Sequence, residues 1–307
     1  MANRRDVVTD AKSSASLTHQ IFARELATWV KFDPLAREGI DPEGVHQLRV
    51  TSRRLRAELS VLAPLLSRKL SQDLAKELRW IGKILGRQRD FDVLSGLLIH
   101  LQHEDAPYDS SVLSRLQRHR EAERRRVRNA LTSSRYQRLA RDLATWAVSP
   151  PLRRRARSRA SDVLRPGLLA GLVELFHDVD SVGPNATDET LHQLRITIKH
   201  ARYRAEVASS ALGANVNAVA KDLARAQGVL GDLHDRVVAS SYLYEWRTSR
   251  WPIDKTNTHD PVEIALSALA DEMTSLRQAW RAPLAKARRH STALYLIDEE
   301  ESTTGGA

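Results

Sequence analysis

Hydrophobic residues recur at helical spacing along most of the chain. Leu17, Ile21, Leu26 and Trp29 form the first run, and Asp33-Pro34 is expected to end that helix. Further helices are expected at 45–66, 67–87, 112–131, 136–146, 163–177, 191–212, 216–247 and 261–290, with a bend at Gly86 after which the third helix continues to about 103. No segment combines period-two alternation with β-branched enrichment, so the chain is predicted to be all-α.

Breaks in this pattern divide the chain into two halves. Loops are expected at 104–110, at Pro150-Pro151, at 178–189 and around Trp251-Pro252. Each half holds about four long helices, which is enough for one bundle. We expect a first helical bundle at 14–148 and a second at 152–292, together forming one domain. Residues 1–13 and the acidic tail 297–307 are expected to be disordered.

One helix occurs twice in the sequence. Residues 45–66 read VHQLRVTSRRLRAELSVLAPLL and residues 191–212 read LHQLRITIKHARYRAEVASSAL. Both contain His-Gln-Leu-Arg, followed at equal spacing by a threonine and an arginine. The two histidines are 146 positions apart (192 − 46 = 146), close to half of the 307 residues. This pattern predicts a duplicated helical unit.

Each copy carries a row of basic residues on one face of its helix. The members of the first cation row are His46, Arg49, Arg53 and Arg56, and those of the second cation row are His192, Arg195, Lys199 and Arg202. At about 100° and 1.5 Å per residue, each row occupies an arc of about 80° and extends for about 15 Å. The leucines of the first copy form a separate stripe that is expected to face the core.

A row of basic residues is usually a solvated face, paired with acids three or four positions away. Here Glu58 is the only acid between His46 and Leu66. Neighbouring like charges repel, so the row costs stability unless an anion lies against it. Because the same costly pattern occurs in both halves, the sequence favours an anion-binding site.

The overall charge agrees with an anionic partner. The chain has 48 Lys and Arg against 38 Asp and Glu, a net charge of +10. Such a balance points to nucleic acid, polyphosphate or an anionic membrane surface. Residues 115–165 contain 16 arginines and four acidic residues, so the excess is localised. With 42% hydrophobic residues the chain can still form a substantial core.

Other classes of protein are disfavoured. The absence of cysteine excludes disulfides and thiolate metal sites and fits a reducing cytosol. We find no signal peptide and no apolar run near the roughly 18 residues that a membrane span needs. A cytoplasmic protein without membrane contact is expected.

A second paired motif lies on the third helix of each half. LGRQRD at 85–90 matches LGDLHD at 230–235. Arg89 and His234 each follow a leucine of the apolar stripe by four residues, so each is expected to point inward, where a cation needs a partner. Asp90 and Asp235 are candidates for a structural ion pair, which is the alternative to ligand binding.

Together these motifs resemble the conserved histidine α-helical domain, or CHAD, family over about residues 14–290. The resemblance implies two four-helix bundles related by pseudo-twofold symmetry around a basic central groove or pore. It further implies binding of inorganic polyphosphate and association with polyphosphate granules in bacteria. By position, the implied polyphosphate-binding residues are those of both cation rows together with Arg89 and His234.

Other positions are assigned by the same resemblance. The family usually has Lys or Arg where this chain has His200, which predicts sensitivity to pH near neutrality because an unperturbed histidine titrates near pH ~6.5. On the helix at 112–131, Arg120 and Arg124 are the expected contributors. The Arg135-Tyr136 pair also matches a family pattern.

Two alternatives to polyphosphate binding remain. A nucleic-acid-binding protein would use the same basic excess, but aromatic residues are only 5% and no helix-turn-helix or RNA-recognition signature is present, so nucleic acid is expected only as a nonspecific competitor. For an enzyme, the sequence lacks ExExK, HExxH and Walker motifs and a carboxylate cluster suited to Mg²⁺. Binding without catalysis, cofactor or metal is expected, with granule-associated proteins as further candidate partners.

Overall fold

The computed structural model describes residues 13–39, 41–101, 110–248 and 261–304. Nearly all of these residues are helical, and no strand occurs within the described ranges. The prediction of an all-α chain is confirmed. The helices of the first half are α1 (Ser14–Glu38), α2 (Pro42–Val61), α3 (Arg68–His100), α4 (Ser110–Thr132) and α5 (Ser134–Val148), with a short 3₁₀ turn η1 (Ala63–Leu65).

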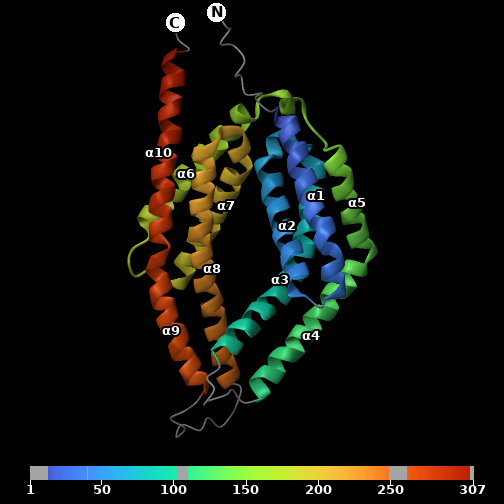
Figure 1. Ribbon diagram of the computed structural model, residues 1–307, viewed down its shortest axis with the longest axis vertical. Coiled ribbons are helices and arrows are strands. Elements are labelled where there is room, and N and C mark those ends of the chain that lie inside the picture. Colours follow the sequence, from blue (N-terminus) through green and yellow to red (C-terminus); the bar gives the residue numbers. More distant parts are fainter. Residues whose placement is uncertain (1–12, 40, 102–109, 249–260, 305–307) are drawn as a thin grey trace, which may run out of the picture.

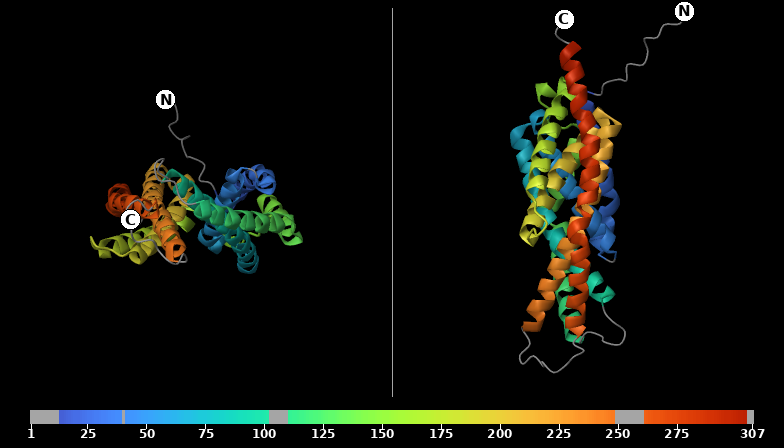
Figure 2. Two further views of the ribbon diagram at one scale, coloured as in Figure 1. Left: turned by 90° about the horizontal axis from the view of Figure 1, so that it is seen from below. Right: turned by 90° about the vertical axis from the view of Figure 1, so that its left-hand side faces the viewer.

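The second half follows after the 3₁₀ turn η2 (Arg154–Arg157). Its helices are α6 (Ala160–Ser181), α7 (Asp188–Leu212), α8 (Ala214–Thr248), α9 (Pro261–Ala279) and α10 (Arg281–Thr304). Figures 1 and 2 show the helices of the two halves as two groups that stand side by side. The groups meet where α2 packs against α7 and α3 against α8. The duplicated helices therefore lie in the middle of the molecule.

Apolar stripes of these helices form the core. Leu48 and Leu55 of α2 and Ile198 of α7 are almost fully buried, as the periodicity predicts. They belong to one continuous hydrophobic cluster that contains residues of both halves. Burial of each such side chain contributes about 1.5–3 kcal/mol. A smaller cluster joins the far ends of α3 and α8 to α4 and α9.

The first helix is longer than predicted. Asp33-Pro34 was expected to end it, but α1 runs through Pro34 to Glu38. Pro34 has no N–H to donate to the carbonyl of Val30. Two hydrogen bonds to the Asp33 carboxylate stabilise this turn instead. Arg37 Nε donates to it at 2.7 Å, and the Tyr136 hydroxyl donates to it as well. The helix ends at Gly39, whose φ of 70° favours glycine.

Two predictions for the C-terminal part of the chain, a single helix at 261–290 and a disordered tail from Ile297, are wrong. The expected helix at 261–290 is two helices, because Pro283 has no N–H to offer the carbonyl of Ala279 and the chain turns at Trp280. The tail expected to be disordered from Ile297 is helical to Thr304, since glutamates are good helix formers. Each half thus contributes five α-helices in the described part of the chain, not four.

Two helix boundaries within the first half also differ from the predictions. α3 is an unbroken helix through Gly86, the position of the predicted bend, and it ends at His100. Ser110, expected to lie in a loop, begins α4. The predicted disorder at 1–12 and 305–307, and the predicted breaks at 104–109 and 251–252, lie outside the described residues.

Candidate anion-binding site

The N-terminal caps of α2 and α7 begin these helices at equivalent positions relative to their cation rows. The Asp41 carboxylate accepts from the N–H of Glu43 at 2.8 Å and Pro42 begins α2, whereas the Thr187 hydroxyl accepts from the N–H of Thr190 at 3.2 Å at the start of α7. His46 is consequently the fifth residue of α2, and its counterpart His192 is the fifth of α7. Both rows begin at the same depth in their helices.

The two rows converge across the contact between α2 and α7. The pKa of half-buried Lys199 is lowered first by burial and then by the positive charges of Arg195 on its own helix and Arg53, Arg56 and Arg49 on α2. The pKa of Arg195 is lowered by burial and also by Arg53. Because such effects fall with distance, they place cations of both helices in one region.

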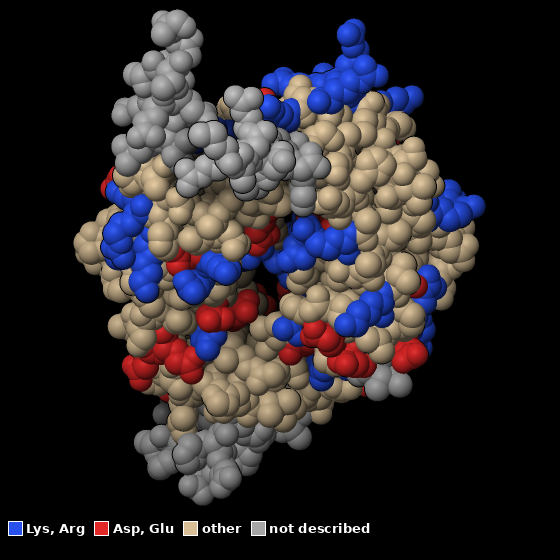
Figure 3. Space-filling model, turned by 45° about the horizontal axis from the view of Figure 1, so that its top comes forward, with Lys and Arg blue, Asp and Glu red and all other residues tan. Residues whose placement is uncertain are grey.

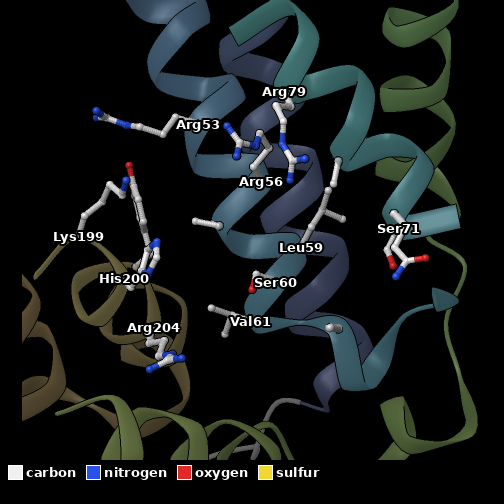
Figure 4. Close-up of a pocket in the computed structure, with 15 residues that line it drawn as sticks. Arg53, Arg56, Leu59, Ser60, Val61, Ser71, Arg79, Lys199, His200 and Arg204 are labelled. Carbon is white, nitrogen blue, oxygen red and sulfur yellow. The ribbon is translucent and has the colours of Figure 1, made fainter. Parts of the chain in front are cut away.

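A pocket of about 410 Å³ lies where the rows meet. Its basic lining residues are Arg53 and Arg56 from α2, Arg79 from α3, and Lys199, His200 and Arg204 from α7. Figure 4 shows Arg56 and Arg79 side by side on one wall, with Lys199 and His200 on the opposite wall. In Figure 3 the middle of the molecule is hollowed, with Lys and Arg on both sides of the opening.

Several of these cations have no acidic partner. Among the described residues, no carboxylate oxygen lies within 4.0 Å of Arg53, Arg56, Arg79 or Lys199. The Nε atom of Arg53 is moreover buried and without a hydrogen-bond partner in the described structure. Burial of an unpaired donor is unfavourable. The pocket therefore offers positive charge and free N–H groups to an anion.

Glu58, the one acid in the helix of the first cation row, faces away from this pocket. Arg24 of α1 donates to Glu58 at 2.6 Å and to Glu25 at 2.8 Å, and both glutamates are buried. Burial and the nearby Glu25 raise the pKa of Glu58 to about 8. This carboxylate is thus engaged between α1 and α2 and does not neutralise the row.

Two aspartates lie at the other end of the rows. Asp90 is 3.8 Å from Arg49, and the positive charges of Arg89 and Arg195 also act on it. Burial raises the pKa of Asp90, while these arginines oppose the shift. Burial is also the first cause of the raised pKa of Asp235. The carboxylate of the motif thus pairs with Arg49 of α2, whereas no carboxylate oxygen of the described residues lies within 4.0 Å of Arg89 or His234.

Two histidines, His46 of the first cation row and His200 next to Lys199, have lowered pKa values. The pKa of His46 is lowered by burial and by Arg89, Arg49 and Arg53, with Glu43 opposing. The pKa of His200 is lowered by burial and then by Lys199. A positive surrounding disfavours a further positive charge, so an arriving anion would reverse both shifts.

His192 and His234 lie together outside the lining of this pocket, in a separate small pocket between α7 and α8. The rings of His192 and His234 have centroids 5.0 Å apart, and the pKa of His234 is lowered by burial, Arg195 and His192. The Nδ1 atoms of His46 and His192 are both buried without a hydrogen-bond partner in the described structure. The paired motifs thus bring His234 against the second cation row.

Of the thirteen predicted site residues, four line the pocket, namely Arg53, Arg56, Lys199 and His200, and nine do not. Three of those nine have other surroundings on α4 and α7. Arg120 donates through Nε and Nη2 to the buried Asp92, at 3.1 Å each, and so joins α4 to α3. Arg202 lies 3.3 Å from Glu206, one turn further along α7. Arg124 does not line the pocket, and its Nε is buried without a partner. Arg135 donates to Glu77 at 2.5 Å and packs over Trp80, which fastens α5 to α3.

Two pocket residues were missed by the sequence analysis. Arg79 lies seven residues before Gly86, hence on the same face of α3, and Gly86 is where the Arg49 side chain approaches that helix. This spacing was a usable signal. For Arg204 the repeat gave no such signal, because its counterpart in the first copy is Glu58. Arg204 instead fits over Gly171 of α6, where a Cβ atom would collide with it.

Within the described ranges, no group of three or more His, Asp or Glu residues is placed to hold a metal ion. None of the helices described here is long and apolar enough to cross a membrane.

Comparison with known proteins places this architecture. The CHAD domain family matches residues 20–244, well over half of the chain. The chain belongs to the CHAD family. Two relatives from Mycobacterium tuberculosis, Uncharacterized protein MT2285 of strain CDC 1551 and Uncharacterized protein Rv2226 of strain H37Rv, are each 31% identical over 218 residues. The match covers 66% of this CHAD chain but 40% of each relative, so the chain spans about two fifths of their length.

Solved structures share the fold. PptA from Streptomyces chartreusis has a TM-score of 0.70 at 20% identity, covering 89% of this chain and all of that one. The CHAD domain from the plant Ricinus communis has a TM-score of 0.66 at 25% identity, covering 90% of this chain and 92% of that one. These likenesses agree with the all-α CHAD architecture.

Proposed function

We propose that this CHAD protein binds inorganic polyphosphate, without chemical turnover, in the pocket between α2, α3 and α7. The observation that carries the proposal is the meeting of two cation rows from opposite halves, where Arg53, Arg56 and Lys199 have no carboxylate within 4.0 Å in the described structure. A pseudo-twofold relation between the halves, with the basic groove on its axis, is part of the proposal. It is supported by the equal positions of His46 and His192 in their helices.

The chemistry of the pocket suits such a ligand. Polyphosphate carries closely spaced negative charges and presents no bases, so it requires cations at short intervals without groove-reading side chains. Arginine donates two parallel hydrogen bonds to phosphate oxygens, and these charge-assisted bonds are among the strongest available to a protein. Phosphate bound in the pocket would also partner the buried Nε of Arg53, and a chain that extends along the first cation row would reach the buried Nδ1 of His46.

A cellular location follows from this ligand. A protein that holds long polyphosphate chains would concentrate at polyphosphate granules in the cytoplasm. Granule organisation, recruitment of other proteins and regulation of a polyphosphate enzyme are all consistent with such binding.

The competing function is binding of nucleic acid. Single-stranded nucleic acid is commonly held by stacking its bases on exposed aromatic rings. The aromatic residue in the pocket lining is Tyr203, which is 3% exposed and has Arg202 over its ring. This arrangement offers no exposed aromatic ring on which a base could stack. It therefore favours a phosphate chain that carries no bases.

Calorimetry tests the proposal directly. We expect polyphosphate to bind more tightly than single-stranded RNA of equal charge at the same salt concentration. R53Q/R56Q should weaken polyphosphate binding by about a hundred-fold or more, because two partly buried charge-assisted contacts are lost. The control is R118Q/R125Q, which removes two exposed charges of α4 and should have little effect. RNA that binds more tightly than polyphosphate, or equal losses in both variants, would contradict the proposal.

Turnover requires a separate assay. Incubation of the protein with polyphosphate and either ADP or water should yield neither ATP nor orthophosphate. Formation of either product at a rate that falls in R53Q/R56Q would make the pocket an active site.

A further inference from the structure

A second group of arginines lies on the short turn that joins the two halves. Residues 153–159 contain five arginines and no acid, and all five are exposed. Within the described residues, no carboxylate oxygen lies within 4.0 Å of any of them. The net positive charge of this turn is therefore not balanced locally, and the like charges repel one another.

The backbone of this turn is nevertheless fixed. The N–H of Arg153 donates to the carbonyl of Leu65 and the N–H of Ser67 donates to the carbonyl of Pro151, both at 2.8 Å. The N–H of Ser14 donates to the carbonyl of Ser158 at 3.0 Å. Ala156, in the middle of η2, is 2% exposed and anchors the turn in the core. Its arginines are thus displayed on an ordered support, and binding a ligand does not require ordering of the backbone.

A polar row on α3 connects this turn with the pocket. Gln72, Ala75 and Arg79 line the pocket, and Arg68 lies on the same face one turn before Gln72. At about 100° per residue, Arg68, Gln72 and Arg79 lie within an arc of about 40° and extend for about 16 Å. Arg68 is exposed and directly follows Ser67, which is hydrogen-bonded to Pro151. Positive charge therefore continues from the pocket to η2.

We propose that a polyphosphate chain held in the pocket continues along this face of α3 and that its next segment is bound by Arg68, Arg153, Arg154, Arg155 and Arg157, which we call the outer arginine cluster. This inference rests on the proposed function of the pocket. It makes the binding site longer than the pocket and explains why unpaired arginines are kept on a rigid turn. A short anion fills the pocket alone, whereas a long chain contacts both parts.

The consequence is a dependence of affinity on chain length that the outer arginine cluster controls. We expect R154Q/R155Q/R157Q to weaken binding of long-chain polyphosphate by about ten-fold, as loss of several exposed ionic contacts predicts, and to reduce the salt dependence of binding. Affinity for tripolyphosphate, which is too short to span both parts, should not change. Lysines at the same three positions should largely restore long-chain binding, because the charge is kept.

The matched control is R118Q/R125Q/R128Q, which removes three exposed arginines of α4 and changes the net charge equally. It should leave binding of both ligands within about two-fold of the unmodified protein. All variants are compared by circular dichroism and thermal melting, and exposed substitutions of this kind are expected to fold.

The possible results distinguish a failure of the outer arginine cluster from a failure of the pocket. Unchanged long-chain affinity in R154Q/R155Q/R157Q, an equal loss for tripolyphosphate, or an equal loss in the α4 control would overturn this inference while leaving the pocket intact. Failure of the unmodified protein to bind tripolyphosphate or long-chain polyphosphate would overturn the proposed function itself. Single-stranded RNA that binds through the outer arginine cluster more tightly than polyphosphate would identify this turn as a nucleic-acid site and would also overturn the inference.

Discussion

At the scale of single residues, the pocket stores positive charge that the protein cannot neutralise internally. Arg53 has a buried Nε without a partner, and Lys199 is half-buried beside three arginines of the facing helix. Each of these arrangements lowers stability in the free protein. The anion that we propose for this pocket would supply the missing negative charge on both of its sides.

We expect the histidines to make binding of polyphosphate dependent on pH. Burial and neighbouring cations lower the pKa of both His46 and His200, so both are neutral in the free protein near neutral pH. A bound polyanion raises both pKa values, and binding therefore takes up protons. We expect affinity for polyphosphate to increase as the solution is brought from about pH 8 to about pH 6 at constant ionic strength. Calorimetry in buffers of different ionisation enthalpy measures the proton uptake.

The control for this experiment is the double variant H46Q/H200Q. It should bind polyphosphate with a much flatter pH profile. A flat profile for the unmodified protein, without proton uptake, would contradict a ligating role for these histidines.

At the scale of helices, the two copies of the duplicated element differ one turn beyond the last arginine of each cation row. Arg56 of α2 is followed four residues later by Ser60, whereas Arg202 of α7 is followed at the same spacing by Glu206. An acid four residues away on a helix is close enough to pair with the arginine. Arg56 lines the pocket and Arg202 does not. The two rows are thus similar in sequence but unequal in the charge they offer.

This asymmetry predicts unequal effects of matched substitutions. R56Q should weaken polyphosphate binding by about ten-fold or more, while R202Q should weaken it by less than about three-fold, because Arg202 is already paired. S60E should mimic the second copy and weaken binding almost as much as R56Q. Ser60 is exposed, so this substitution should not disturb the core. Equal losses in R56Q and R202Q, measured by calorimetry, would refute the asymmetry.

The same helices indicate what sequence can predict. The apolar stripes and the equal spacing of His46 and His192 predicted the helical class and both cation rows, because these depend on neighbours three to seven residues apart. The Asp33-Pro34 break and the ligand role of Arg120 depended on distant partners. Tyr136, more than a hundred residues away, holds Asp33, and Asp92 of α3 binds Arg120. Arg204, which lines the pocket and lies 3.7 Å from Glu174 of α6, was missed because the repeat has an acid at that position.

At the scale of the whole molecule, the charged pocket lies where the two halves meet. α2 and α7 pack against each other across this boundary, and one hydrophobic cluster includes residues of both halves. Apolar burial thus holds the halves together while the cation rows repel across the same boundary. A polyanion between the rows would remove the repulsion and link the halves. Ligand binding and stability of the whole fold should therefore be coupled.

This coupling can be measured by thermal melting. Polyphosphate should raise the melting temperature by several degrees at saturating concentration, since ligand at a hundred times Kd adds about 2.7 kcal/mol to the free energy of unfolding. Sodium chloride of equal ionic strength should raise it much less, because simple screening does not bridge the rows. R53Q/R56Q relieves part of the repulsion, so it should melt at a higher temperature than the unmodified protein without ligand and lose most of the polyphosphate-induced rise. A double variant that melts at a lower temperature than the unmodified protein without ligand would show that these arginines stabilise the free fold. That result would contradict the repulsion between the rows on which this coupling depends.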